Sequence, residues 1–282
     1  MKNLFSAIIF LVSITVSAQL TFDKTVLDCG NKWVAFPEGS NGFYKYGFIY
    51  LDTQMGLTFD YSGNFKIDTA GKIIAIPNEK GSSIKIPLYP NKIQIAAIPE
   101  NLFEQLKIAN KIPDWFNSYT SKEGSIEQLY SWGSTYNAWG ECKKALESLE
   151  KAYPIDSEFK DIKLQLAHSY NCVQQYEKAI ILLSAILNTN PNDAYAYKEY
   201  IFALANTQQL DLAIENYNKS LKLCTDTTYV PENAFYILQG YFYKIDQPNF
   251  EKWLGANENV MISNPQIKKI IDQMKLAFKK KQ

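Results

Sequence analysis

Three alanines recur at a constant interval in the second half of the chain, at positions 145, 179 and 213. Each is followed four residues later by a large side chain, and the pairs are Ala145–Leu149, Ala179–Leu183 and Ala213–Tyr217. Small residues also stand twelve residues before the first two alanines, at Gly133 and Ala167. A fixed period of about 34 residues is typical of stacked supersecondary units, so it constrains the fold more than any other feature.

The pattern resembles the tetratricopeptide repeat, a helix–turn–helix unit of about 34 residues with a small residue in its first helix and an alanine in its second. Residues 125–227 hold three such repeats, at 126–159, 160–193 and 194–227. The resemblance implies a right-handed solenoid of helical hairpins. It also implies close helix packing at Gly133, Ala145, Ala167, Ala179 and Ala213, with Gly133 against Ala145 and Ala167 against Ala179. The chain is similar to secreted bacterial repeat proteins that carry an amino-terminal β region.

The spacing of apolar residues changes near residue 99. Over residues 19–99 they alternate, as in Leu57, Phe59 and Tyr61 on one face, with Thr58 and Asp60 on the other, polar face. This alternation predicts a small antiparallel β domain of six or seven short strands, arranged as a sandwich or a partial barrel. Residues 100–124 indicate a short helix and a linker, and residues 228–282 a degenerate fourth helical pair with a capping helix. The expected fold class is therefore α+β, with the β domain ahead of an all-α solenoid.

The first eighteen residues are typical of a signal peptide. Lys2 precedes an apolar stretch over residues 4–16, and Val16-Ser17-Ala18 forms a small-residue cleavage site. We therefore expect cleavage after Ala18 and a secreted or periplasmic protein, with an uncleaved membrane anchor as the alternative. No cysteine follows the cleavage site, so a lipid anchor is not expected, and no later stretch predicts a transmembrane segment.

The composition argues against several functional classes. All 29 basic residues are lysine, and they equal the 29 acidic residues in number. A neutral chain without arginine is poorly suited to bind nucleic acid, which requires phosphate neutralisation. His168 is the single histidine, so metal motifs that need two histidines are excluded, and no phosphate-binding loop or nucleophile elbow occurs. We expect no metal and no cofactor, and the oligomeric state stays open.

The family resemblance implies a groove that holds a peptide or protein segment and is lined by the first helix of each repeat. Carried over by position, the lining residues are Glu127, Tyr130, Ser134 and Asn137, then Asp161, Leu164, His168 and Asn171, then Tyr195, Lys198, Phe202 and Ala205. Tyr130, Tyr195 and Phe202 are candidate anchors, since aromatic residues dominate binding hot spots. Asn137 and Asn171 are candidates to hydrogen-bond an extended peptide. The alternative is that these positions are solvated or dock the β domain.

Four cysteines, Cys29, Cys142, Cys172 and Cys224, allow three disulfide connectivities. The repeat resemblance places Cys142, at the start of a second helix, beside Cys172, at the end of the next first helix. We therefore favour a Cys142–Cys172 disulfide, with four free thiols as the alternative. Only elimination supports a Cys29–Cys224 bridge.

These features together predict an exported, non-enzymatic scaffold for protein–protein interaction. The alternative places the activity in the β domain, as glycan binding or as a carboxylate-based hydrolase, with the repeats as a spacer. Trp33, Phe36, Tyr44 and Tyr46 motivate this alternative, because exposed aromatic rings can stack on sugars.

Overall fold

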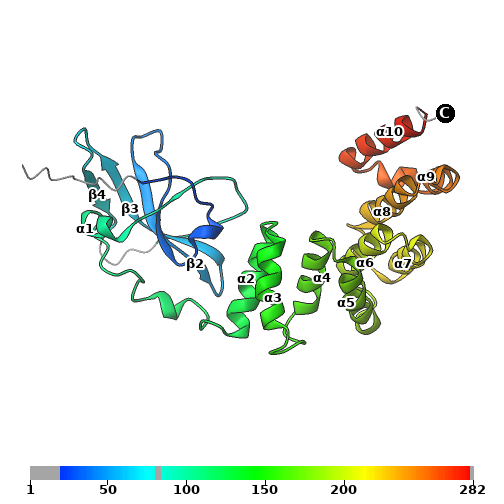
Figure 1. Cartoon of the computed structure of the whole chain (residues 1–282), viewed down its shortest axis with the longest axis horizontal. Helices are drawn as coiled ribbons and strands as arrows, with labels where there is room; N and C mark the ends of the chain where they lie inside the picture. The colour runs from blue at the N-terminus through cyan, green and yellow to red at the C-terminus, as the bar shows by residue number, and fades with distance from the viewer. Residues whose placement is uncertain (1–19, 80–83, 280–282) are drawn as a thin grey trace, which may run out of the picture. The chain divides into compact units, whose positions relative to one another are not determined.

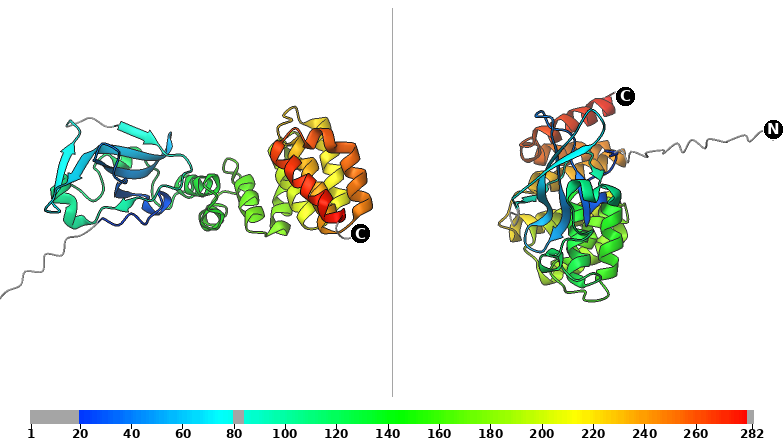
Figure 2. Two further views of the ribbon diagram at one scale, coloured as in Figure 1. Left: turned by 90° about the horizontal axis from the view of Figure 1, so that it is seen from above. Right: turned by 90° about the vertical axis from the view of Figure 1, so that its left-hand side faces the viewer.

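A computed structural model of the protein describes residues 20–79 and 84–279 (Figures 1 and 2). The chain divides into two compact units, Met1–Thr120 and Ser121–Gln282. The first contains an antiparallel sheet and the second a series of helices, which confirms the α+β fold class with a helical repeat region. The expected signal peptide lies outside the described residues.

The first unit is built on one six-stranded antiparallel sheet. Its strands are β1 (Lys32–Ala35), β2 (Tyr44–Asp52), β3 (Gly56–Ile67), β4 (Ile73–Pro77), β5 (Ile84–Pro87) and β6 (Ala96–Ala97). The order is β4-β3-β2-β1-β6, and β5 also pairs with β3. Because β3 has 12 residues, its outer edge pairs with β5 over residues 58–61 and with β4 over residues 63–67. The described strands form a single sheet, so a two-sheet sandwich is not formed.

Thr58 and Asp60 lie on the face opposite Leu57 and Phe59, as the alternation predicts, but this face is not a polar surface. Both are buried, at 0% and 6% exposure. Asp60 pairs with Phe48 of β2, so the two side chains share a face. Trp115 and Phe116 pack edge-on against Phe48, with ring centroids 6.1 and 5.9 Å away. The segment that leaves the sheet includes α1 (Phe103–Leu106) and two short 3-10 turns (Glu100–Leu102 and Phe116–Ser118). It therefore covers the face of the sheet that carries Thr58 and Asp60.

The second unit is a run of helical hairpins followed by one more helix (Figure 1). The helices are α2 (Ile126–Ala138), α3 (Cys142–Ala152), α4 (Ile162–Cys172), α5 (Tyr176–Thr189), α6 (Ala194–Asn206), α7 (Leu210–Leu223), α8 (Val230–Tyr243), α9 (Gln247–Met261) and α10 (Pro265–Lys279). Each first helix contacts the first helix of the next hairpin, from α2 to α4, α6 and α8. The first helices thus form a continuous layer.

A left-handed residue ends the first helix of every hairpin and reveals the repeat register. These residues are Gly140, Gln174, Gln208 and Ile245, with φ of 76, 64, 60 and 59°. The first three are evenly spaced, and the last comes later than that spacing predicts, so the fourth hairpin follows a three-residue insertion. By this register Leu238 and Phe250 occupy the positions of Gly133 and Ala145 in the fourth hairpin. Both are buried, so this hairpin is packed with large side chains where the first one has small ones.

The small residues of the repeats lie in the helical core. Ala145, Ala167, Ala179 and Ala213 are fully buried. A Cβ atom at Gly133 would lie 2.4 Å from Cγ of Leu149. Gly133 therefore makes room for the leucine that lies one turn after Ala145. At the other end α10 buries Phe278 against Phe242 and Phe250, with ring centroids 5.3 and 5.0 Å away. This helix covers the last hairpin, as the terminal repeat of a solenoid requires.

Candidate functional site on the first helices of the repeats

Seven of the expected partner-binding residues are partly exposed on α2, α4 and α6. We call this set the first-helix face, and its members are Tyr130, Ser134, Leu164, His168, Tyr195, Lys198 and Phe202. They come from the first helices of three consecutive hairpins, and each of these helices contacts the next. The same helical positions recur in each repeat because the repeat register is constant over these three helices.

Asn137 and Asn171 lie between the helices instead of on this face. Nδ2 of Asn137 donates to the backbone oxygen of Gln165 at 2.9 Å and to its Oε1 at 3.0 Å. Nδ2 of Asn171 makes the same pair of bonds to Glu199, at 2.9 and 2.8 Å. Both asparagines are buried. Their amide donors are therefore used to join consecutive first helices, and they do not offer the peptide contacts expected from the sequence.

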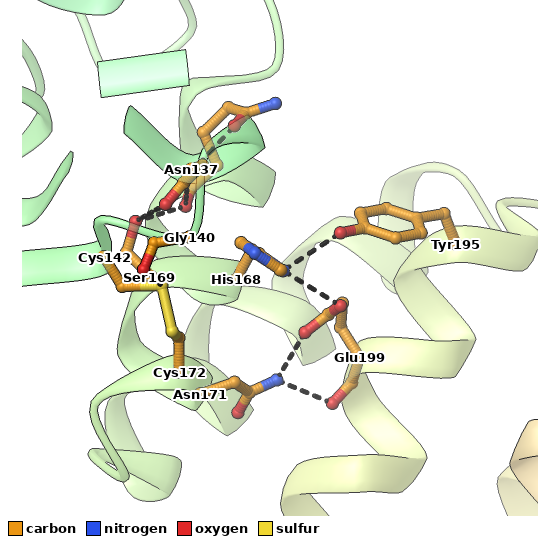
Figure 3. Close-up of a disulfide and its surroundings, with 10 residues drawn as sticks. Asn137, Gly140, Cys142, His168, Ser169, Asn171, Cys172, Tyr195 and Glu199 are labelled. Atoms are coloured by element: carbon orange, nitrogen blue, oxygen red, sulfur yellow. Dashed lines mark hydrogen bonds and ion pairs between the residues drawn. A yellow bond between two sulfur atoms is a disulfide. The ribbon is translucent and has the colours of Figure 1, made fainter. Parts of the chain in front are cut away.

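Glu199 is the centre of a polar cluster on α4 and α6 (Figure 3). Its Oε1 lies 3.1 Å from Nδ1 of His168 and 2.9 Å from Nζ of Lys198. The hydroxyl of Tyr195 lies 3.0 Å from the same His168 nitrogen. The Glu199 side chain is 4% exposed, whereas that of His168 is 30% exposed. The cluster therefore places a buried negative charge directly beneath a partly exposed imidazole.

The contacts of Glu199 decide its charge. Burial alone would raise the pKa of this carboxyl group, because a low-dielectric site disfavours the ion. The hydrogen bond from His168, the positive charge of Lys198 and the amide of Asn171 outweigh burial and lower its pKa to about 2. Glu199 is therefore ionised at neutral pH. Burial and the Glu199 charge together raise the pKa of Tyr195, which stays a neutral phenol.

The aromatic members of the first-helix face contact other rings. Tyr195 packs on Tyr229, with centroids 5.6 Å apart, and Phe202 packs edge-on against Tyr236 at 5.0 Å. Tyr130 lies edge-on to Phe159 at 5.4 Å, and its hydroxyl bonds to Asp161. Tyr195 and Phe202 thus contact rings that follow the third repeat, whereas Tyr130 contacts a ring at the end of its own repeat. Part of each of the three side chains stays exposed.

Sequence reasoning missed Gln165 and Glu199, which accept the asparagine bonds. A signal was present, since Gln165 and Glu199 are separated by the same interval as Asn137 and Asn171. The rings of Tyr229 and Tyr236 were also missed. A signal was present for them as well, since Tyr229 and Tyr236 follow Tyr195 and Phe202 by the same interval that separates Glu199 from Gln165.

This arrangement suits binding better than catalysis. The oxygens of Glu199 already accept bonds from His168, Lys198 and Asn171. A general base must reach a substrate proton, whereas the Glu199 side chain is only 4% exposed and lies beneath His168. Among the described residues, no three His, Cys, Asp or Glu side chains gather in a way that could hold a metal ion.

The structure contains a disulfide between Cys142 and Cys172, with Cα atoms 6.1 Å apart (Figure 3). It joins the start of α3 to the end of α4, and so links the first hairpin to the second. Cys29 and Cys224 are free thiols, and burial raises the pKa of both. A Cys29–Cys224 bridge is therefore absent.

The aromatic residues behind the glycan alternative are mostly engaged in the sheet. Tyr46 is 2% exposed, and its hydroxyl donates to the backbone oxygen of Leu106 at 2.9 Å. Tyr44 stacks on Phe65 and Phe36 lies edge-on to Phe59. Trp33 borders an open pocket that is also lined by Trp115, Lys107, Asn110 and Asp114. A buried Tyr46 cannot stack on a sugar, so Trp33 is the strongest of the four candidates.

Residues 122–233 match the model of the YfiO family, described as an outer membrane lipoprotein. The matched stretch runs from just before α2 to the first turn of α8. The match supports a tetratricopeptide-like family for the helical repeats and does not include residues 1–121, which hold the sheet. A comparison of the chain with curated proteins finds no match. Within residues 20–79 and 84–279, no helix is both long and apolar enough to cross a bilayer.

Proposed function

We propose that the protein is an exported, non-enzymatic scaffold that holds a peptide or protein segment along the first helices of its repeats. The family match supports a role at the cell envelope, because the matched family is described as an outer membrane lipoprotein. The single observation that carries the proposal is the first-helix face, where aromatic, aliphatic and cationic side chains from the first helices of three consecutive hairpins lie partly exposed.

The fixed orientation of this face favours binding. Tyr195 is held by His168 and Tyr229, and Phe202 is held by Tyr236. A partner that covers these rings would not have to immobilise them, so little conformational entropy is lost on binding. Exposed aromatic anchors with fixed rotamers are the residue type that dominates protein–protein affinity.

A site-specific photo-crosslinker tests the proposal. We would place it at Leu164 on the first-helix face and, as the matched control, at Ile181, which is 67% exposed on the second helix α5. In envelope extracts we expect a discrete protein adduct from position 164 and none from position 181. Adducts of equal yield from both positions, or from neither, would contradict the proposal.

Alanine variants then identify the anchors. We expect Phe202→Ala or Tyr195→Ala to lower the yield of the position-164 adduct by at least about tenfold, as loss of a hot-spot residue does. Ile181→Ala should leave the yield unchanged. Circular dichroism of each variant checks that loss of the Tyr229 or Tyr236 contact has not unfolded the helices.

A second candidate function is glycan binding in the pocket beside Trp33. It is favoured by the pair of indoles, Trp33 and Trp115, next to the polar side chains of Asn110 and Asp114. Asp114 is the one carboxylate that lines the described pocket, whereas glycoside hydrolysis uses two. Binding without cleavage is therefore the expected behaviour. Titration of the full chain with a glycan array, and with Trp33→Ala as the comparison, tests it. Equal signals from the two proteins would eliminate this candidate.

A further inference from the structure

Four isoleucines form a column along the outer edge of β3. Ile86 and Ile84 of β5 lie opposite Phe59 and Tyr61, and Ile76 and Ile74 of β4 lie opposite Asn64 and Lys66. Residues directly opposite each other in an antiparallel pair point to the same face of the sheet. The pairing of β2 with β3 shifts register between Tyr46 and Gly47, so the two ends of β3 have to be compared through β2. Gly47 pairs with Tyr61, and Lys45 pairs with Asn64. Since Lys45 and Gly47 share a face of β2, all four isoleucines share one face as well.

This isoleucine column is open to solvent. Ile74, Ile76, Ile84 and Ile86 are between 39% and 49% exposed. Single exposed isoleucines are common on protein surfaces, but four in line on two edge strands form a patch. A contiguous exposed apolar patch commonly marks a site where a protein or a membrane binds. The isoleucine column is therefore a candidate interaction surface.

The charged strand residues on this face have one sign. Lys32, Lys45 and Lys66 lie on it, because Lys32 pairs with Ile49, Lys45 with Asn64, and Lys66 with Ile74. None of the described strand residues on this face is acidic. The strand carboxylates Asp52 and Asp60 belong to the opposite face, where both are buried. An aliphatic column bordered by lysines is complementary to a surface that has an outer layer of negative charge and an apolar interior.

We propose that this face of the sheet docks on an anionic phospholipid surface. The isoleucines would enter the boundary between headgroups and acyl chains, while Lys45 and Lys66 meet the lipid phosphates. Because every second residue of a strand points the same way, the four side chains project together from one face, as insertion into a bilayer surface requires. The proposal does not rest on the proposed function, since its residues belong to the sheet and not to the repeats.

Vesicle flotation tests the proposal with the chain from Gln19 onward, which lacks the apolar leader. We expect it to float with vesicles of phosphatidylglycerol and phosphatidylcholine, and not with phosphatidylcholine alone. Rising salt should weaken the association because it screens the lysines. Ile76→Asp combined with Ile84→Asp should lower partitioning at least about tenfold, through lost burial and added negative charge. Lys66→Glu should lower it roughly fivefold or more on the anionic vesicles.

The matched control is Ile181→Asp, which changes a more exposed isoleucine in the helical unit and should leave flotation unchanged. The milder Ile76→Ser variant, checked by circular dichroism, separates loss of docking from loss of folding. Absence of flotation with every vesicle would overturn the proposal and assign the column to an acidic protein surface. An equal loss caused by Ile181→Asp would overturn it too.

Discussion

Asn171 has a buried amide oxygen without a donor. Among the described residues, nothing donates to its Oδ1. In the preceding repeat the hydroxyl of Ser169 donates to Oδ1 of Asn137 at 2.7 Å. The residue one repeat after Ser169 is Ala203, which has no hydroxyl and is fully buried. The two asparagines thus make the same bonds with their amide nitrogens. They differ in that the serine hydroxyl next to Asn137 has no counterpart next to Asn171.

This difference predicts the effect of a single added oxygen. Ala203→Ser should give Asn171 the donor that Asn137 has, and raise the free energy of unfolding by about 0.5–1 kcal/mol. Ser169→Ala should leave Asn137 Oδ1 unpaired and lower it by about 1–2 kcal/mol. Urea denaturation measures both. A loss of stability in Ala203→Ser would mean that the site has no room for the hydroxyl.

Glu199 predicts a pH dependence of stability. Its pKa falls from the usual 4.5 to about 2 on folding, so folding favours the charged form. The stabilisation is complete above about pH 4.5 and is lost as the pH falls towards 2, with a limit of roughly 3 kcal/mol. We expect Glu199→Gln to be less stable than the unmodified protein at pH 7, and the gap to close between pH 4.5 and 2.

The matched control for this prediction is Glu215→Gln. Glu215 pairs with Lys219 at 2.7 Å in an exposed position, and surface pairs contribute about 0–1 kcal/mol. Its variant should therefore stay within about 1 kcal/mol of the unmodified protein at every pH. If both variants show the same pH profile, the cluster around Glu199 is not the cause.

At the scale of the element, the helix pairs could be predicted because one constant period governs Ala145, Ala179 and Ala213. The hydrogen bonds between consecutive first helices could be predicted only in part. The repeat pattern indicates which side of a helix a residue occupies, but Asn137 and Asn171 lie at the border between the exposed side and the side that contacts the next first helix. Their amide groups donate to the next first helix, so both side chains are buried although their positions in the repeat are ones that could contact a bound peptide.

In the sheet, alternation placed Asp60 correctly on the face opposite Phe59 but could not show that Trp115, from a segment well beyond the sheet, covers that face.

Two helical glycines predict opposite effects of the same substitution. A Cβ atom at Gly133 would meet Leu149 at 2.4 Å, whereas nothing lies within 4 Å of the same atom at Gly255 in α9. Leu149 is fully buried and cannot move aside. Gly133→Ala should therefore lower the free energy of unfolding by about 1–3 kcal/mol through overpacking. Gly255→Ala should raise it by up to about 1 kcal/mol through helix propensity. Thermal or urea unfolding of the two variants checks this pair, and a stable Gly133→Ala would show that α2 and α3 can separate without loss.

At the scale of the whole molecule, each unit encloses a core of its own. Tyr46, Phe65 and Leu106 belong to a core of the sheet unit, and the repeat alanines belong to cores of the helical unit. The two proposed surfaces divide in the same way, with the isoleucine column on the sheet and the first-helix face on the repeats. If both proposals hold, the protein would bind lipid through one unit and a protein segment through the other.

Separate cores predict separate unfolding, and the disulfide provides a way to assign each transition. Cys142 and Cys172 close a loop of 30 residues within the helical unit, which corresponds to about 3–4 kcal/mol on the entropic account. Calorimetry of the full chain should show two transitions. Cys142→Ala combined with Cys172→Ala should lower the helical one by roughly 10 °C, since 1 kcal/mol shifts a unit of this size by about 2–4 °C. The sheet transition should stay in place, because Cys29 is a free thiol. One transition that moves as a whole would mean that the two cores unfold as one cooperative body.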